Sequence, residues 1–142
     1  MIRPRAVALL DTMWGGRKTR APRWFRISPY NFSGRRLYRL VGSDVDILVT
    51  NCCPVMQTSA HDHGTPDAAY VAENLRRLEP FALLLVCGAV AQRTYAASGY
   101  NIGNAHLLTL KHPAARTWTK KELEDTARQV QSLLRGGEGG TI

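Results

Sequence analysis

The segment Asp46-Ile-Leu-Val-Thr-Asn51, followed by Cys52-Cys53-Pro54, is the most informative part of this chain about its fold. It is an apolar run that stops at a polar side chain and a proline. The stretch Leu107-Leu-Thr-Leu-Lys-His112-Pro113 repeats this arrangement later in the chain. Short, continuous apolar runs are typical of strands that are covered on both faces, as in parallel sheets. Parallel sheets bind ligands outside the carboxyl ends of their strands, so Asn51 and His112 are candidate site residues.

The rest of the chain alternates between expected strands and expected helices. The apolar runs Val7 to Leu10 and Ala82 to Val86 add two strands to those at Asp46 to Thr50 and His106 to Leu110. This alternation predicts an α/β fold, a three-layer αβα sandwich with a four-stranded parallel sheet. Helices are expected at residues 34–42, at 89–97, from the capping residues Thr65-Pro66-Asp67 to Leu78, and from Thr119 to Leu134.

The length of 142 residues predicts one domain, residues 1–135, followed by a flexible glycine-rich tail at 136–142. Two long loops, residues 12–33 and 52–64, are expected to carry function. We expect no membrane span, because no run approaches the roughly 20 apolar residues that a span needs. The chain is expected to act as a monomer.

The cysteines indicate a reducing, cytoplasmic setting. There are three of them, Cys52, Cys53 and Cys87, and no CxxC pair is present. Neither a zinc ribbon nor an iron–sulfur cluster is therefore indicated, and no cofactor is expected. The His61-Asp62-His63 segment offers potential metal ligands at close spacing. We interpret it instead as a polar loop near nucleic-acid phosphates and expect no metal.

The positive charge is concentrated in the first third of the chain. The net charge is +8, yet residues 1–43 carry ten Lys or Arg and one acid, whereas residues 44–142 are nearly neutral. Aromatic residues are interleaved with these basic residues. Because basic groups neutralise phosphates and aromatic rings stack on bases, this region predicts a DNA interface; the alternative is a solvated arginine-rich surface. The named DNA-binding candidates here are Arg17, Lys18, Arg35 and Arg36.

Four motifs, in this order along the chain, resemble those of the uracil-DNA glycosylase superfamily. Three precede the last strand: the loop Pro29-Tyr-Asn-Phe-Ser-Gly34, the strand that ends at Asn51, and the segment from Leu78-Glu-Pro80 through Gly88 to Ala91. The fourth is Lys111-His112-Pro113-Ala-Ala-Arg116, which resembles a His-Pro loop of the family. The resemblance spans residues 7–134.

The resemblance implies a role for each matching residue. Asn51 would read the pyrimidine edge of a base, since an amide both donates and accepts hydrogen bonds. His112 would donate to the base oxygen that gains charge as the glycosidic bond breaks. Tyr30 or Phe32 would stack on the base, and Arg116 would enter the duplex in its place. The alternatives are a turn-forming Asn51, a His112 satisfied by backbone, a core aromatic, and a phosphate-binding Arg116.

The first family motif is altered in this chain. A polar residue that positions the attacking water is expected in the turn Leu10-Asp11-Thr12-Met13-Trp14-Gly15-Gly16, where its position falls on Thr12 or Met13. Asp11 lies one residue earlier and is the candidate catalytic carboxylate, or else it caps the turn. His61 or Asp62 is a further candidate for orienting water.

The leading hypothesis is a DNA glycosylase-like protein that flips uracil or a modified base from DNA and hydrolyses its N-glycosidic bond. Flipping is needed because the bond and the base edge are inaccessible within the stack. One alternative is a catalytically silent DNA-binding module that retains the fold. The other is an enzyme acting on free nucleosides or nucleotides, which would not need so much positive charge.

Overall fold

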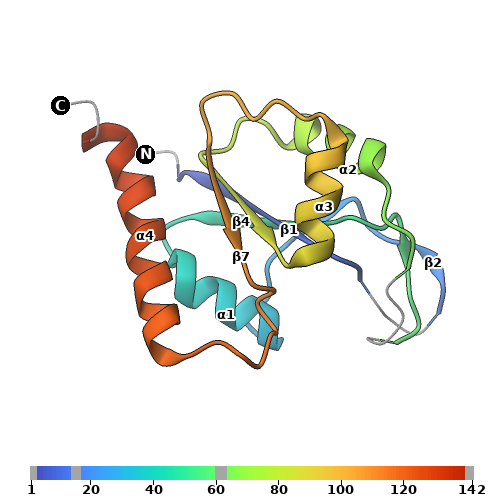
Figure 1. Cartoon of the computed structure of the whole chain (residues 1–142), viewed down its shortest axis with the longest axis horizontal. Helices are drawn as coiled ribbons and strands as arrows, with labels where there is room; N and C mark the ends of the chain where they lie inside the picture. The colour runs from blue at the N-terminus through green and yellow to red at the C-terminus, as the bar shows by residue number, and fades with distance from the viewer. Residues whose placement is uncertain (1–2, 14–16, 60–63, 140–142) are drawn as a thin grey trace.

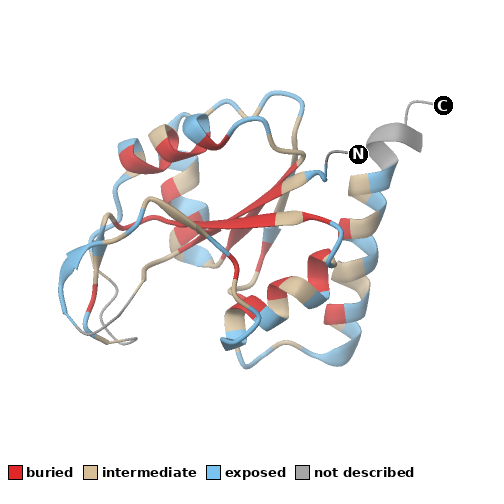
Figure 2. Cartoon of the chain, turned by 180° about the vertical axis from the view of Figure 1, so that it is seen from behind, coloured by how far each residue is buried: buried red, intermediate tan, exposed pale blue. Residues whose placement is uncertain are grey.

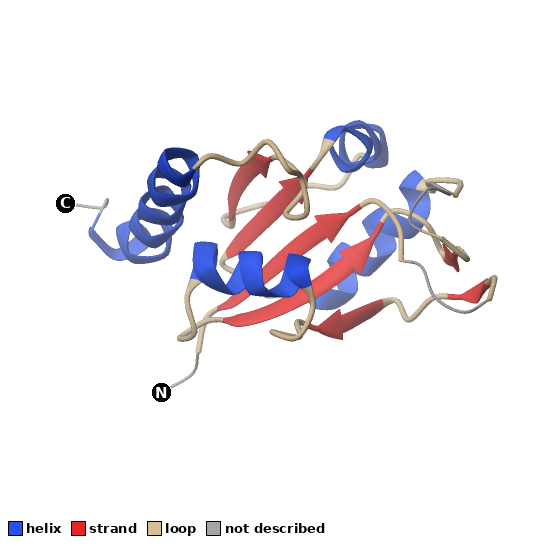
Figure 3. Ribbon diagram, turned by 90° about the horizontal axis from the view of Figure 1, so that it is seen from below, coloured by secondary structure: helices blue, strands red, loops and turns tan. Residues whose placement is uncertain are grey.

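The computed structural model of the chain describes residues 3–13, 17–59 and 64–139, with side chains described as far as residue 135. A central sheet has helices on both of its faces (Figure 1 and Figure 3), which confirms the α/β, three-layer αβα class. The strands are β1 (Arg5–Leu10), β2 (Thr19–Arg20), β3 (Trp24–Arg26), β4 (Asp46–Asn51), β5 (Val55–Met56), β6 (Leu83–Cys87) and β7 (His106–Leu110). The helices are α1 (Phe32–Val41), α2 (Ala68–Leu78), α3 (Ala89–Ser98) and α4 (Lys120–Gly139).

The four expected strands form the parallel part of the sheet, but the sheet is mixed and has five strands. Its order is β3-β4-β1-β6-β7, and β3 pairs antiparallel with β4. The prediction of a four-stranded, wholly parallel sheet was therefore wrong in this respect. So was the expectation that residues 12–33 form only a loop, since they contain β3 and also β2, which pairs with β5 in a separate ribbon.

The short length of β3 explains why its sequence gave no clear strand signal. Three residues are too few for a periodic pattern, and β3 is held by its neighbours instead. The Thr50 hydroxyl donates to the Arg23 carbonyl at 2.7 Å, and an Arg23 guanidinium N–H donates to Asn74 Oδ1 at 2.9 Å. These bonds fix the segment that covers the open edge of β4, an edge that would otherwise present unpaired backbone groups.

Successive side chains of β1 point to opposite faces of the sheet and contribute to two hydrophobic cores, one on each face. Ala6, Ala8 and Leu10 pack on the side of α1 and α4, while Val7 and Leu9 pack on the side of α2 and α3. Figure 2 shows the buried residues concentrated in the central strands and on the inner faces of the helices. Burial on both faces is why these strands read as continuous apolar runs.

The helix ends follow local capping chemistry. Asp67 Oδ1 accepts the Tyr70 backbone N–H at 3.0 Å, so α2 begins at Ala68, after Asp67, rather than at Pro66 as expected. The expected capping box at the start of α4 is present: Thr119 and Glu122 each accept the other's backbone N–H at 3.1 Å. Helix α4 continues to Gly139, into the segment expected to be the tail. Within the described ranges, no helix combines the length and apolar character that crossing a bilayer requires.

Candidate functional site

The candidate residues Asp11, Asn51 and His112 all follow or end parallel strands, so they lie at the same end of the sheet, where the carboxyl ends of β4, β1, β6 and β7 meet. Leu10 and Asn51, the last residues of β1 and β4, are register partners, and Asp11 follows directly. On the other side of β1, β6 ends at Cys87 beside Leu110 of β7. The Gly88 N–H donates to the Leu110 carbonyl at 2.8 Å, so the turn after β6 is fixed against the start of the His112 loop.

A cavity of about 500 Å³ opens at this edge beside Asn51. Asn51 is only 4% exposed, so its side-chain amide is largely shielded from bulk water. The volume lies within the roughly 300–1,000 Å³ that small-molecule sites occupy. The cavity is lined by Leu10, Thr12, Met13, Phe25, Ile27, Ser28, Asn31, Phe32, Ser33, Gly34, Leu37, Val49, Asn51 and Ala114.

Another part of the cavity wall is built by the turn that opens α1. Asn31 caps the helix, its Oδ1 accepting the Gly34 N–H at 2.6 Å. A Cβ added to Gly34 would lie 1.7 Å from the Ser28 carbonyl oxygen, so only glycine lets the turn pack this closely. The turn thereby places Phe32, the first residue of α1, in the cavity wall.

The structure separates the two aromatic candidates. The Phe32 side chain lines the cavity and is half-exposed, which leaves ring surface available for a ligand. Tyr30 is 90% exposed and is not among the residues that line this cavity. Phe32 is therefore the better placed of the two for stacking.

His112 is held in one orientation by its own loop. Its Nδ1 accepts the Ala114 backbone N–H at 3.0 Å, and Trp118 Nε1 donates to the His112 carbonyl at 2.9 Å. Burial lowers the pKa of His112, and the charge of Asp11 opposes this shift to a smaller extent. The imidazole is thus favoured in its neutral form, and because Nδ1 accepts, the ring proton resides on Nε2.

Asp11 lies within electrostatic reach of His112, but it is not a lining residue of the cavity. Its Oδ1 atom is buried. The two positions that correspond to the water-positioning residue, Thr12 and Met13, do line the cavity. The altered motif therefore places Thr12 and Met13 in the cavity wall, with the Thr12 hydroxyl oxygen itself buried, while the Asp11 carboxylate acts electrostatically on His112.

The buried cysteines beside the site are poor nucleophiles. Desolvation raises the pKa of Cys52 to about 12 and also raises the pKa of Cys53 above its usual value. Thiols with raised pKa values stay protonated near pH 7, whereas the thiolate is the reactive form. Both cysteines serve as small buried side chains in the segment that directly follows β4.

The basic candidates fall into two environments. Arg17, Lys18, Arg35 and Arg116 are exposed, in positions suited to a large polyanion. Arg36 is partly buried, and its guanidinium lies over the ring of Phe32. The same guanidinium also lies near the ring of Trp118, a residue that the sequence did not identify as a candidate. No periodic or compositional signal marks Trp118, because its contacts come from residues distant in sequence.

The candidate water-orienting and metal-binding segment His61-Asp62-His63 lies outside the described residues, as does Trp14. Across residues 3–13, 17–59 and 64–139, no group of three or more potential ligand side chains is arranged to hold a metal ion.

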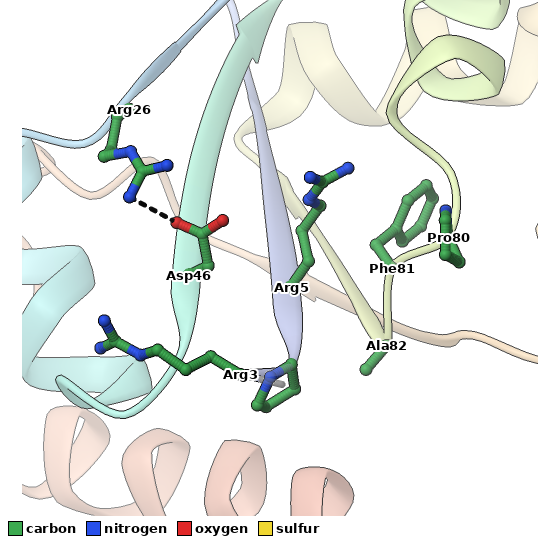
Figure 4. A pocket seen from close by; sticks show the side chains of 8 residues that line it. Arg3, Arg5, Arg26, Asp46, Pro80, Phe81 and Ala82 are labelled. Atoms are coloured by element: carbon green, nitrogen blue, oxygen red, sulfur yellow. Dashed lines mark ion pairs between the residues drawn. The ribbon is translucent and has the colours of Figure 1, made fainter. Parts of the chain in front are cut away.

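A larger cavity of about 750 Å³ lies at the opposite edge of the sheet, where the strands begin (Figure 4). Asp46, the first residue of β4, lines it together with Arg3, Arg5 and Arg26. Arg26 pairs with Asp46 at 3.2 Å, and Arg5 Nη1 donates to the Leu78 carbonyl at 2.7 Å. Because this cavity lies away from Asn51 and His112, the smaller one is the candidate functional site.

Comparison with known proteins identifies the family of the chain. No curated protein matches the chain. A family model described as uracil DNA glycosylase superfamily matches residues 13–134. The matched range includes Phe32, Asn51 and His112, and it begins at Met13, so that Asp11 and Thr12 lie just outside it. Since the match covers most of the sequence and the fold agrees with it, the chain belongs to the uracil DNA glycosylase superfamily.

Proposed function

We propose that this protein is a DNA glycosylase-like enzyme that flips uracil or a modified base from DNA and hydrolyses its N-glycosidic bond. One observation carries the proposal: the shielded amide of Asn51 lines a cavity of about 500 Å³ at the carboxyl ends of the strands, where the loop that contains His112 also begins. Membership of the superfamily supports the same reaction class. A flipped base is the form of substrate that such a cavity can enclose.

Base recognition is assigned to Asn51 and Phe32. The Asn51 amide oxygen accepts one hydrogen bond and its NH₂ group donates another, which matches a base edge with adjacent N–H and C=O groups. Phe32 stacks on the face of the same base, an interaction worth roughly 1–3 kcal/mol per base. A shielded amide also rejects bases that leave its hydrogen bonds unmade.

Bond cleavage is assigned to His112. As the C1′–N bond breaks, its electron pair moves into the base, and a carbonyl oxygen of the base gains negative charge. The neutral imidazole donates its Nε2 hydrogen to that oxygen, which lowers the energy of the leaving base. A water oxygen forms the new bond to C1′ and loses its proton to Asp11 or to solvent. DNA binding is assigned to Arg17, Lys18, Arg35 and Arg116, whose exposed charges neutralise phosphates.

The second candidate function is a DNA-binding module that retains the pocket without catalysis. The observation that favours it is the cavity lining, which has Thr12 and Met13 in place of a carboxylate or amide. Such a module would still bind DNA in a salt-sensitive manner and accept a flipped base. It would differ from the enzyme only in the absence of abasic product.

The decisive experiment incubates the protein with oligonucleotides that carry uracil, hypoxanthine, thymine mispairs or modified pyrimidines. Alkaline cleavage of the products then reveals abasic sites. We expect cleavage of at least one substrate, and loss of that cleavage in His112→Ala with DNA binding retained. Salt-sensitive DNA binding without cleavage of any substrate would instead establish the silent module.

A further inference from the structure

A cationic side chain lies close to two aromatic rings, one of which belongs to the cavity wall. The Arg36 guanidinium carbon is 4.8 Å from the centre of the Phe32 ring and 6.0 Å from a ring centre of Trp118. Both distances fall within the roughly 6 Å at which a cation is attracted to an aromatic face. Arg36 therefore connects helix α1 with the segment that follows β7.

The connection continues to the backbone of His112. The Trp118 indole donates its Nε1 hydrogen to the His112 carbonyl oxygen at 2.9 Å. Lys111 also approaches the Trp118 ring, at 5.7 Å, and forms an ion pair with Glu122 at 2.7 Å. A chain of contacts thus runs from Phe32 in the cavity wall, through Arg36 and Trp118, to His112.

The environment of Arg36 differs from that of a phosphate-binding arginine. Its Nη1 atom is buried and has no hydrogen-bond partner among the described residues, whereas the adjacent Arg35 is exposed. Burying an unpaired donor is unfavourable, so the contacts with the two rings must compensate for it. Held in this way, the guanidinium is not free to present its full fork of N–H donors to DNA.

We propose that Arg36 is a positioning residue that fixes the Phe32 ring and the His112 loop relative to each other. The sequence predicted that Arg36 contacts DNA, whereas its contacts in the structure favour this positioning role. The inference deepens the proposed function, on which it rests, because a flipped base must meet Phe32 and His112 at the same time. The role requires a flat cation, so lysine would replace Arg36 only in part.

The first test reads the Trp118 indole directly and needs no substrate. In ¹⁵N-labelled protein, the Trp118 indole signal is identified by its disappearance in Trp118→Phe. We expect Arg36→Met to shift this signal and to speed its hydrogen exchange at least tenfold, and Arg36→Lys to have a smaller effect. The matched control Arg35→Met should leave both the position and the hydrogen-exchange rate of the indole signal unchanged. An unaltered indole signal in folded Arg36→Met, with folding verified by thermal unfolding, would overturn the proposal.

The second test compares the two arginines on DNA. Each lost phosphate contact reduces the slope of log affinity against log salt concentration by about one. We expect that reduction in Arg35→Gln but not in Arg36→Gln, which should instead lower single-turnover cleavage at saturating protein by at least tenfold. A reduced slope for Arg36→Gln with normal cleavage would identify a phosphate contact. If the unaltered protein cleaves nothing, the proposed function fails, while the indole signal still decides the role of Arg36.

Discussion

Leu10 and Asn51 are register partners at the ends of β1 and β4. The turn that begins with Asp11 therefore starts directly beside Asn51. The Cys52 N–H reinforces this arrangement, because it lies 3.0 Å from both the Leu10 and Asp11 carbonyl oxygens. Two paired strand ends therefore hold Asn51, proposed to read the base, beside Asp11, proposed to take up the proton of water. A change in the turn after β1 alters the chemistry at the cavity while the position of Asn51 is maintained by the sheet.

Replacing Asn51 by Asp is expected to change base preference. The amide both donates and accepts, whereas a carboxylate only accepts, so a base that requires a donor loses its partner. Discrimination built on such hydrogen bonds reaches roughly 10⁴-fold. We expect a loss of about 10²–10⁴-fold in single-turnover cleavage of the preferred base. A substrate with an exposed amino group should suffer less.

The matched control for this prediction is Asn104→Asp, which makes the same chemical change at an exposed position. It should retain the original rate and preference. If Asn51→Asp keeps the original preference as well, Asn51 is a turn-forming residue and does not read the base.

Replacing Gly34 by Ala is expected to destabilise the protein and distort the cavity wall. The added Cβ would approach the Ser28 carbonyl oxygen to 1.7 Å, so the backbone of the turn would have to move. Overpacking typically costs roughly 1–3 kcal/mol, and a clash with backbone belongs at the upper end of that range. Urea unfolding measures the loss. Ser33→Ala in the same turn is the control and should change stability by less than about 0.5 kcal/mol.

Stability is expected to fall on mild acidification in a way that depends on His112. Burial lowers the pKa of His112 in the folded protein below its ordinary value of 6.5, so the unfolded chain binds more protons there as the pH falls. The contribution to folding is complete above pH 6.5 and is lost as the pH decreases toward the folded-state pKa. Protonation of Nδ1 would also break its bond from Ala114.

Denaturant unfolding of the unaltered protein and of His112→Gln between pH 7.5 and 5 checks this expectation. The difference in unfolding free energy between the two proteins should move in favour of His112→Gln as the pH decreases. A difference that stays constant across this range would contradict a lowered pKa at His112.

Replacing Asn74 by Leu is expected to loosen β3. Asn74 is fully buried, accepts from Arg23 at 2.9 Å and lies 3.4 Å from the Thr50 hydroxyl, so its loss leaves the Arg23 group with fewer partners. Unmade buried hydrogen bonds cost roughly 1–3 kcal/mol. Hydrogen exchange of the Trp24–Arg26 amides should accelerate more than that of β6. Equal acceleration in both strands would indicate general destabilisation instead.

The residues by themselves determined the layered α/β class and the parallel core of the sheet. Strands buried on both faces must be apolar throughout, and capping residues mark the starts of helices. Both signals lie within short segments, so these elements can be predicted from the local sequence. The same reasoning placed Asn51 and His112 at the carboxyl ends of their strands, where open α/β sheets bind ligands. Motif order led from there to the superfamily that the family model shows.

Other features depend on contacts between segments that are distant in sequence, so they could be seen only once the chain was folded. Strand β3 is three residues long and exists because the edge of β4 and the side chain of Asn74 hold it. The choice of Phe32 over Tyr30 for the cavity depends on how the Gly34 turn packs against Ser28. The contacts of Arg36 with the rings of Phe32 and Trp118 join segments far apart in sequence, and no local pattern records such pairs.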